Sequence, residues 1–156
     1  MPSLQKTVLV LIVKKSYLDV YFNKSSINGG NFGFSIGQST VKLDLQNCLI
    51  KNVKSIGFSD YNSRLSSSIK ETLMQGSKVG FRANSGQSLS LNVENCTVAD
   101  NTDKAFSVRN IHNLNLSIIH TGFERNTERF TIRWLEQSLQ RKNLCPHFQL
   151  QHYVYE

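Results

Sequence analysis

The chain has 156 residues, of which 39% are hydrophobic, and its formal net charge at pH 7 is +7. This length and composition fit one domain with its own core. No apolar run approaches the roughly 18 residues that a membrane-spanning helix requires, so the sequence predicts no transmembrane segment.

The N-terminal residues 1–15 contain the apolar run Thr7–Val13, which is followed by Lys14 and Lys15. This run is short for a secretory signal and lacks a small-residue cleavage site, and its β-branched residues favour a strand. We interpret residues 1–15 as an incomplete first coil of a repeating structure. Because no segment that would cover its open end is evident, we expect a fragment, a divergent gene model or a chain that needs a partner.

Residues 16–133 repeat every 23–25 residues, and apolar positions recur at matching places in each repeat. Three apolar columns lie two residues apart, and mostly polar residues lie between them. This alternation is typical of a β-strand with one buried face. The columns are Leu18, Val41, Leu65, Leu89 and Leu114; Val20, Leu43, Ser67, Leu91 and Leu116; and Phe22, Leu45, Ile69, Val93 and Ile118.

Three more columns follow in each repeat: one of small residues, one apolar and one of phenylalanine. They are Ser25, Cys48, Thr72, Cys96 and Thr121; Ile27, Ile50, Met74, Val98 and Phe123; and Phe34, Phe58, Phe81, Phe106 and Phe130. Each repeat therefore holds two or three short strands and no helix. The repeat is too short for a propeller blade of roughly 40 residues and lacks the leucine-rich-repeat spacing. We predict an all-β parallel β-helix, a solenoid whose coils stack at ~4.8 Å.

Asparagine and glycine mark the expected turns between strands. One set follows the second strand of each repeat: Asn28, Asn52, Gly76, Asn101 and Asn126. A second set, Asn47 and Asn95, precedes the small-residue column, where His120 also lies. Both residue types adopt a left-handed backbone at low cost, so we predict left-handed turns at these positions. Stacked asparagines can also form hydrogen bonds from coil to coil, and we interpret them as turn residues rather than ligands.

The pattern N-C-x-[IV] at Asn47–Ile50 and Asn95–Val98, with its recurring asparagines and phenylalanines, resembles the right-handed parallel β-helix (pectin-lyase-like) class. That class includes pectate lyases, polygalacturonases and many non-enzymatic surface proteins. The Asn-Cys turns and the last coil, Phe123–Phe130, are most similar to β-helix regions of animal extracellular proteins of the bark beetle type. The class resemblance covers about residues 16–133 and implies that the five repeats form about five right-handed coils. The resemblance to proteins of the bark beetle type implies a fragment of a much larger junctional or adhesive protein.

The three cysteines predict no intramolecular disulfide. Cys48 and Cys96 share one column but lie two coils apart, which separates their Cα atoms by roughly 9.6 Å, or two steps of 4.8 Å. A disulfide requires a separation of less than about 7 Å, so we expect two small buried thiols. Cys145 lies in the C-terminal segment and is the candidate for reactivity or intermolecular pairing.

The positive charge raises the question of nucleic-acid binding. Six basic residues fall at unlike places in their repeats, which predicts that they are scattered over several faces: Lys42, Lys54, Lys70, Lys78, Arg82 and Lys104. Nucleic-acid binding needs a basic stripe with aromatic platforms, and here the phenylalanines are assigned to the core. We therefore expect no nucleic-acid partner and consider an acidic glycan or another protein as the partner.

The enzymes of the β-helix class use acidic residues on outward strand positions. Asp19 and Asp44 lie at such positions, but a third acid for a calcium site is missing. The tripeptide Asn101–Asp103 matches the first polygalacturonase motif, while the other motifs of that family are absent. The four histidines, His112, His120, His147 and His152, have no evident nucleophile partner. We therefore predict no catalytic, cofactor or metal site.

The C-terminal residues 134–156 depart from the repeat. Trp134–Lys142 has leucines at helical spacing, and Pro146 and two alternating apolar pairs follow. We predict a helix or an irregular segment that folds over the last coil as a cap, and the alternative is an unstructured tail. A cap is expected because the last coil would otherwise expose unpaired backbone groups and associate end to end with another chain.

These features predict a non-catalytic binding or adhesive β-solenoid that is part of a larger extracellular or cell-surface protein. The extracellular location is what the class resemblance implies. Sequons at Asn23, Asn95 and Asn115 are compatible with secretion. The alternative is a degenerate or partial carbohydrate-active β-helix related to polysaccharide lyases or hydrolases. Formation of product from a pectin-type glycan distinguishes the two functions.

Overall fold

A computed structural model describes residues 11–30, 34–59, 63–133 and 148–149 of the chain, and every regular element in them is a β-strand. After β1 (Leu11–Lys14), three strands recur five times. The first of each set is β2 (Tyr17–Asn23), β5 (Thr40–Gln46), β8 (Arg64–Lys70), β11 (Ser88–Glu94) and β14 (Asn113–Ile119). The second is β3 (Ser26–Asn28), β6 (Leu49–Lys51), β9 (Leu73–Gln75), β12 (Thr97–Ala99) and β15 (Gly122–Glu124). The third is β4 (Phe34–Gly37), β7 (Ser55–Ser59), β10 (Val79–Asn84), β13 (Lys104–Arg109) and β16 (Glu128–Arg133).

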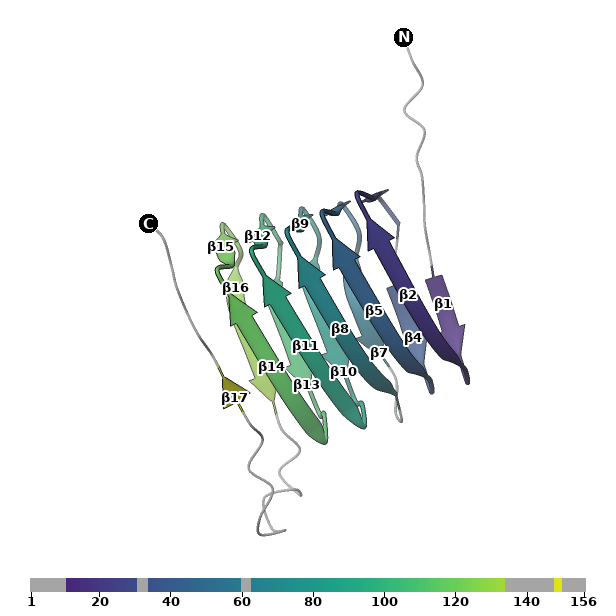
Figure 1. Ribbon diagram of the computed structural model, residues 1–156. Coiled ribbons are helices and arrows are strands. Elements are labelled where there is room, and N and C mark those ends of the chain that lie inside the picture. The colour runs from purple at the N-terminus through teal and green to yellow at the C-terminus, as the bar shows by residue number, and fades with distance from the viewer. Residues whose placement is uncertain (1–10, 31–33, 60–62, 134–147, 150–156) are drawn as a thin grey trace.

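Corresponding strands of successive coils pair in parallel, which confirms the predicted all-β parallel solenoid (Figure 1). The long first strands form a six-stranded sheet with β17 (Phe148–Gln149), and the short second strands form a five-stranded sheet. Strands β7, β10, β13 and β16 form a four-stranded sheet, while β4 pairs with β1. Hydrogen bonds between coils thus replace the local hydrogen bonds that a helix would provide.

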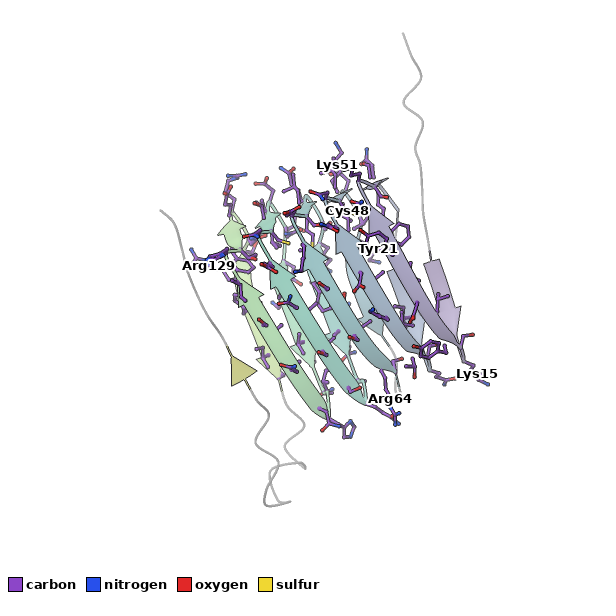
Figure 2. The ribbon with its side chains drawn as sticks, in the orientation of Figure 1. Lys15, Tyr21, Cys48, Lys51, Arg64 and Arg129 are labelled. Atoms are coloured by element: carbon purple, nitrogen blue, oxygen red, sulfur yellow. The ribbon has the colours of Figure 1, made fainter. Side chains whose placement is uncertain are left out.

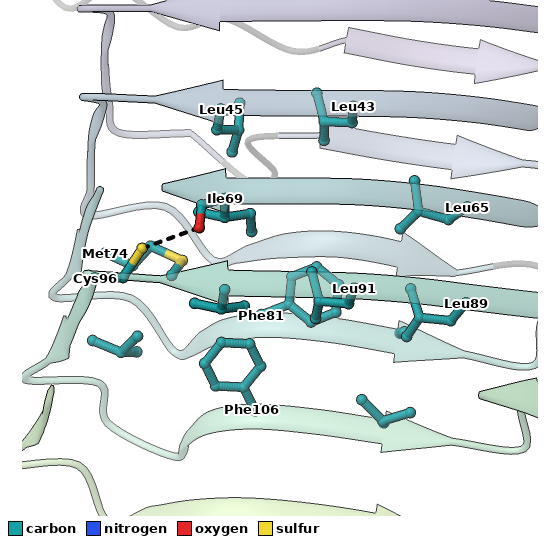
Figure 3. Packing of buried hydrophobic residues seen from close by; sticks show 14 of the residues in the cluster. Leu43, Leu45, Leu65, Ile69, Met74, Phe81, Leu89, Leu91, Cys96 and Phe106 are labelled. Carbon is teal, nitrogen blue, oxygen red and sulfur yellow. Dashed lines mark hydrogen bonds between the residues drawn. The ribbon is translucent and has the colours of Figure 1, made fainter. Parts of the chain in front are cut away.

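The predicted inward columns of the first two strands are confirmed by the pairing register. Leu91, for example, pairs with Ser67 on one side and Leu116 on the other, and Val98 lies between Met74 and Phe123. Side chains along β5, β8 and β14 alternate between exposed or half-buried and buried, as the period of two requires. The core is therefore a narrow stack of one apolar layer per coil (Figure 3).

Ser67 is the polar residue in these inward columns, and its buried hydroxyl group has a hydrogen-bond partner. The Ser67 hydroxyl donates a 2.8 Å hydrogen bond to the carbonyl of Leu43, one coil earlier. A buried hydroxyl without such a partner costs roughly 1–3 kcal/mol, so this bond makes serine acceptable in an otherwise apolar column.

The predicted phenylalanine column is correct only from β10 onward. Phe81 pairs with Phe106, and Phe106 pairs with Phe130. Phe58, however, pairs with Ala83, and the residue opposite Phe81 is Ile56. The register shifts between Val79 and Phe81, where β10 holds one more residue than β7. The expectation of one unbroken column is therefore wrong at Phe58, because this bulge offsets β7 from β10.

Gly80 is the extra residue of this bulge, and it is a site of close backbone approach. A Cβ atom there would lie 2.6 Å from the carbonyl oxygen of Ala105 and 2.9 Å from Cγ1 of Val98. Only glycine fits such a position without moving the backbone. The glycine before Phe81 thus reflects packing between coils.

The first turn of every coil contains one left-handed residue followed by the small-residue column. The left-handed residues are Lys24, Asn47, Glu71, Asn95 and His120, with φ values of 50°, 52°, 49°, 52° and 46°. The predicted turn role of Asn47, Asn95 and His120 is confirmed. Lys24 and Glu71 show that the stacked backbone imposes this conformation on residues that seldom adopt it.

The small-residue column stabilises this turn with a side-chain hydrogen bond. Each member donates to the carbonyl two residues earlier, at the end of the preceding strand. These donors are Ser25 (3.0 Å), Cys48 (3.2 Å), Thr72 (2.8 Å), Cys96 (3.2 Å) and Thr121 (3.0 Å). Serine, threonine and cysteine are the small residues that carry such a donor, which explains the composition of the column.

Cys48 and Cys96 are buried free thiols, as predicted from their two-coil separation. Thr72 lies between them, and its hydroxyl oxygen accepts a hydrogen bond from the backbone N–H of Cys48. Cys96 also contacts the carbonyl of Ile69 (Figure 3). Burial raises the pKa of the Cys96 thiol to about 11, so the thiol stays protonated and unreactive at neutral pH. Cys145 lies outside the described residues.

We expect Cys96→Thr to fold with nearly unchanged stability at neutral pH, since Thr72 and Thr121 occupy the same column. In the wild type, the unfolded thiol ionises first as the pH rises. The free energy of unfolding should therefore fall by roughly 2 kcal/mol more than in the variant between about pH 8 and about pH 10.5. Urea titrations of both proteins at the two pH values measure this difference. An equal fall in both proteins would contradict it.

The second turn corrects the predicted asparagine set. The left-handed residues here are Gly29, Asn52, Gly76, Asp100 and Arg125, with φ values of 82°, 56°, 66°, 53° and 48°. Asn52 and Gly76 were predicted correctly. In every coil the left-handed residue lies two positions after the inward residue of the second strand, whereas Asn28 lies one position after it and Asn101 and Asn126 lie three positions after it.

Asn101 and Asn126 instead form a hydrogen-bonded amide ladder beside the core. Asn101 is buried, and its Nδ2 donates to Oδ1 of Asn126 at 2.7 Å. Its own Oδ1 accepts from the N–H of Ser77, and Nδ2 of Asn126 donates to the carbonyl of Val98. Bonding between asparagines of successive coils therefore occurs at this position and, on the surface, between Asn52 and Asn28, rather than between Asn47 and Asn95.

Among the described residues, a third left-handed turn precedes four of the five long strands, and no sequence pattern predicts it. It includes Lys15, Gln38, Ser85 and Asn110, with φ values of 50°, 50°, 59° and 54°. These residues share only a polar side chain, so their sequence gives no specific signal. In the coils whose turns are all described, three left-handed turns close the solenoid around its core.

Beyond the last coil, Phe148 and Gln149 form β17, which pairs in parallel with Leu116 and Ser117 of β14. This strand continues the six-stranded sheet by one position. The helix predicted in Trp134–Lys142, and the rest of the proposed cap or tail, lie outside the described residues.

Candidate functional site

A groove of about 590 Å³ lies on the outer face of the six-stranded sheet. It runs along the solenoid axis over the first halves of the long strands. Its outward side chains form two rows and one flank: Tyr17, Thr40, Arg64, Ser88 and Asn113; Lys42, Ser66, Ser90 and Asn115; and His112.

The pairing register explains why these residues lie in rows. Lys42, Ser66, Ser90 and Asn115 pair one after another in adjacent strands, so their side chains point outward at steps of ~4.8 Å. The two serines are short, and they leave a hollow between the larger side chains of Lys42 and Asn115. The five strands give the groove a length of roughly 19 Å, from four steps of 4.8 Å.

Larger side chains with fixed contacts border this floor. Nε of Arg64 donates a 2.9 Å hydrogen bond to Oε1 of Gln87, one coil later, and Figure 2 shows Arg64 at the end of its strand. The His112 Nδ1 lies 3.2 Å from the carbonyl oxygen of Gly86. Tyr17 is 73% exposed, which is unusual for a large aromatic side chain. The groove thus combines the exposed ring of Tyr17, the hydrogen-bonded guanidinium of Arg64 and a row of hydroxyl and amide groups.

The charge of the groove is positive, since its lining includes Lys42 and Arg64 and, among the described residues, no carboxylate. Asp44 lies beside it and contacts Lys42, with 3.6 Å between Nζ and Oδ2. Farther along the same face, Lys70 and Glu94 form a 2.8 Å ion pair. Their hydrogen bond raises the pKa of Lys70 and lowers that of Glu94, so both stay charged near neutral pH.

The two acids considered for catalysis do not form a pair of facing carboxylates. Asp19 pairs in register with Lys42, whereas Asp44 pairs with Tyr21 of the same strand as Asp19. Tyr21, which Figure 2 labels, is 60% exposed and donates a hydrogen bond to Gln46. Asp44 is engaged by Lys42, so its position is explained by an ion pair on the surface.

The residues of the polygalacturonase-like tripeptide have structural contacts in this fold. Asn101 belongs to the amide ladder, and Asp103 contacts Nζ of Lys104 at 3.0 Å. His112 and His120 lie at turns, while His147 and His152 lie outside the described residues. Within the described ranges, no group of three or more His, Cys, Asp or Glu side chains is arranged to hold a metal ion.

The predicted scatter of the basic residues is wrong for four of the six. Lys54, Lys78, Arg82 and Lys104 line one cleft, together with Arg109 and Asp103. Lys42 and Lys70 lie on the six-stranded sheet. The sequence period alone does not reveal this cleft, because the bulge at Gly80 and the extra residue before β13 shift the alignment of the repeats.

The chain matches no family model, no curated protein sequence and no solved structure. Within the described ranges, no helix is long and apolar enough to span a membrane.

Proposed function

We propose that this solenoid is a non-catalytic binding module and that its groove holds an extended acidic glycan. The observation that carries this proposal is the lining of the groove: a row of hydroxyl and amide groups at a constant step, bordered by an exposed tyrosine and two cations. A linear glycan offers hydroxyl groups and ring faces at regular intervals, which matches such a surface.

Each part of the groove has a distinct task in this proposal. Ser66, Ser90 and Asn115 exchange hydrogen bonds with sugar hydroxyls along the chain. Arg64 and Lys42 bind carboxylates, since charge-assisted hydrogen bonds are about twice as strong as neutral ones. Tyr17 packs its ring against the apolar face of a sugar at the end of the groove.

The non-catalytic part of the proposal is supported by the positions of the nearby acids. Asp44 is held by Lys42, and Asp19 lies in the same outward row as Lys42. A glycosidase needs two carboxyl groups on opposite sides of one bond, and a lyase needs carboxylates that bind calcium. We therefore assign these residues to the border of a binding surface.

Calorimetry with an oligogalacturonate tests this function. We expect saturable binding that weakens at high salt, since screening reduces the attraction between the carboxylates and the cations. Arg64→Ala and Tyr17→Ala should each weaken binding about tenfold or more. Lys51→Ala is the matched control, because Lys51 is a basic residue of the five-stranded sheet outside the groove, and it should bind like the wild type.

Two results would contradict the proposal in different ways. If no acidic glycan binds, or if Lys51→Ala weakens binding as much as Arg64→Ala, the groove is not the binding site. If the glycan is shortened during incubation, as chromatography of the products would show, the alternative function as a partial carbohydrate-active enzyme replaces the non-catalytic one.

A further inference from the structure

Another hollow is the basic cleft, which has a volume of about 320 Å³ and is lined by Lys54, Lys78, Arg82, Lys104, Arg109 and Asp103, among others. It lies along β10 and β13 of the four-stranded sheet, so it is separate from the groove on the six-stranded sheet.

Stacking of successive coils brings these cations together. Lys54 and Lys78 occupy the turns before β7 and β10, where the N–H of Val79 donates to the carbonyl of Lys54. The N–H of Lys104 donates in turn to the carbonyl of Lys78. Lys54 and Lys78 therefore lie one coil apart, about 4.8 Å, and Lys104 of the next coil pairs with Val79, the residue after Lys78. The three lysines thus gather at one end of the cleft.

Arginines supply the rest of the cleft lining, and small residues leave room for them. Arg82 pairs in register with Gly57 on one side and Ser107 on the other, and Ser107 is itself buried. Arg109 pairs with Asn84 of β10, so it lies next to the same strand. The side chain of Arg82 is thus the largest in its row, and the hollow lies around it.

The charges in the cleft are not balanced. Lys104 contacts Asp103 at 3.0 Å and Glu128 at 2.7 Å, so its charge is compensated. The other four cations have no acidic partner within the described part of the chain: Lys54, Lys78, Arg82 and Arg109. Nε of Arg109 is also buried and donates no hydrogen bond among the described residues. A buried donor without an acceptor is unfavourable, and the arginine that carries it belongs to the lining of the cleft.

We propose that this cleft binds a compact, multiply charged oxyanion, a phosphate or sulfate ester group. Two guanidinium groups match the oxygens of such a group bidentately, and two lysines add compact charges. A single carboxylate would balance only one of four cations. A nucleic acid strand is a poorer match, because the cleft lining holds no aromatic side chain on which bases could stack.

Calorimetric titration tests the cleft. The full chain is titrated with inorganic phosphate and, separately, with inorganic sulfate, both at constant ionic strength. We expect saturable binding of both ions, and Arg82→Gln should weaken it about tenfold or more. The exposed Arg82 is chosen because its replacement leaves the core intact, and Arg109→Gln serves as a second variant. Lys51→Gln removes the same charge on another face and should bind like the wild type.

Glucose 6-phosphate and glucose 6-sulfate identify the source of the group. Tighter binding of either ester than of its free ion assigns the cleft to an ester on a larger molecule, whereas equal or weaker binding assigns it to the free ion. If none of the four probes binds saturably, the proposal is overturned. An equal loss of binding affinity in Arg82→Gln and Lys51→Gln also overturns it.

The two sites can be distinguished in the same set of proteins. Arg64→Ala should leave phosphate binding unchanged while it weakens glycan binding, and Arg82→Gln should do the reverse. The cleft proposal does not depend on the glycan proposal, so either one can fail while the other holds.

Discussion

Leu91→Asp should unfold the solenoid. Leu91 is 1% exposed and lies in the middle of a core column, between Ser67 and Leu116. Aspartate at this position either buries an unpaired charge or draws water into the stack, and both cost several kcal/mol. Since the whole stability of a domain is about 5–15 kcal/mol, circular dichroism and a urea titration should show a mainly unfolded chain.

Ser90→Asp is the matched control for this result, because Ser90 is the neighbouring residue and its side chain is exposed on the opposite face of β11. Its free energy of unfolding should change by less than about 0.5 kcal/mol. Equal destabilisation by the two substitutions would show that the inward and outward faces are assigned incorrectly.

Phe106→Ala should produce the next largest loss, about 3–5 kcal/mol in the free energy of unfolding. Phe106 is 1% exposed and contacts three other rings. Its ring centroid lies 5.5 Å from that of Phe81, 5.8 Å from Phe123 and 5.7 Å from Phe130. Removal of the ring leaves a cavity that the hydrogen-bonded coils on either side cannot collapse to fill.

Phe130→Ala provides the comparison, since Phe130 lies in the last described coil and is only half-buried. The same ring removed there should cost clearly less than in Phe106→Ala. Urea titration of both variants measures the difference. Equal losses, or a larger loss at Phe130, would contradict the position of Phe106 at the centre of the aromatic stack.

The fold could be predicted from the sequence because each coil needs apolar side chains at the same inward positions and polar side chains at the same outward positions. Leu89 and Leu91 lie on one face of β11 for the same reason as Leu114 and Leu116 on β14, and this produces a period in the sequence. The hydrogen-bonded turns before the second strands were predictable as well, since they need a small donor such as Cys96 after each left-handed residue.

Features that depend on a shift between coils could not be predicted in this way. Phe58 is separated from Phe34 by 24 residues and from Phe81 by 23, so it fits the period, yet it pairs with Ala83. The bulge at Gly80 follows from close contact with Ala105 of the next coil, which no local pattern reveals. Asn101 was likewise placed one position away from its true column.

The groove and the basic cleft were missed because each arises from residues that are unremarkable within one repeat. Ser66 and Ser90 form a groove floor only because they pair side by side between longer side chains. Lys54, Lys78 and Lys104 become neighbours through backbone hydrogen bonds between turns of unequal length. To locate such sites, one must know which residues pair between coils. The repeat period of the sequence alone gives this pairing only to within a residue or two.

The stacking register is the claim on which both proposed sites depend, and electron–electron distances between spin labels test it directly. Asp19, Lys42, Ser66, Ser90 and Asn115 pair in series, so Asp19 lies three steps from Ser90 and four from Asn115. Labels at Asp19→Cys and Ser90→Cys, in a chain without its native cysteines, should lie roughly 14 Å apart along the axis, and those at Asp19→Cys and Asn115→Cys roughly 19 Å apart. If the second distance exceeds the first by about one strand spacing, the register is supported. Equal distances, or a shorter distance to Asn115, would contradict the solenoid.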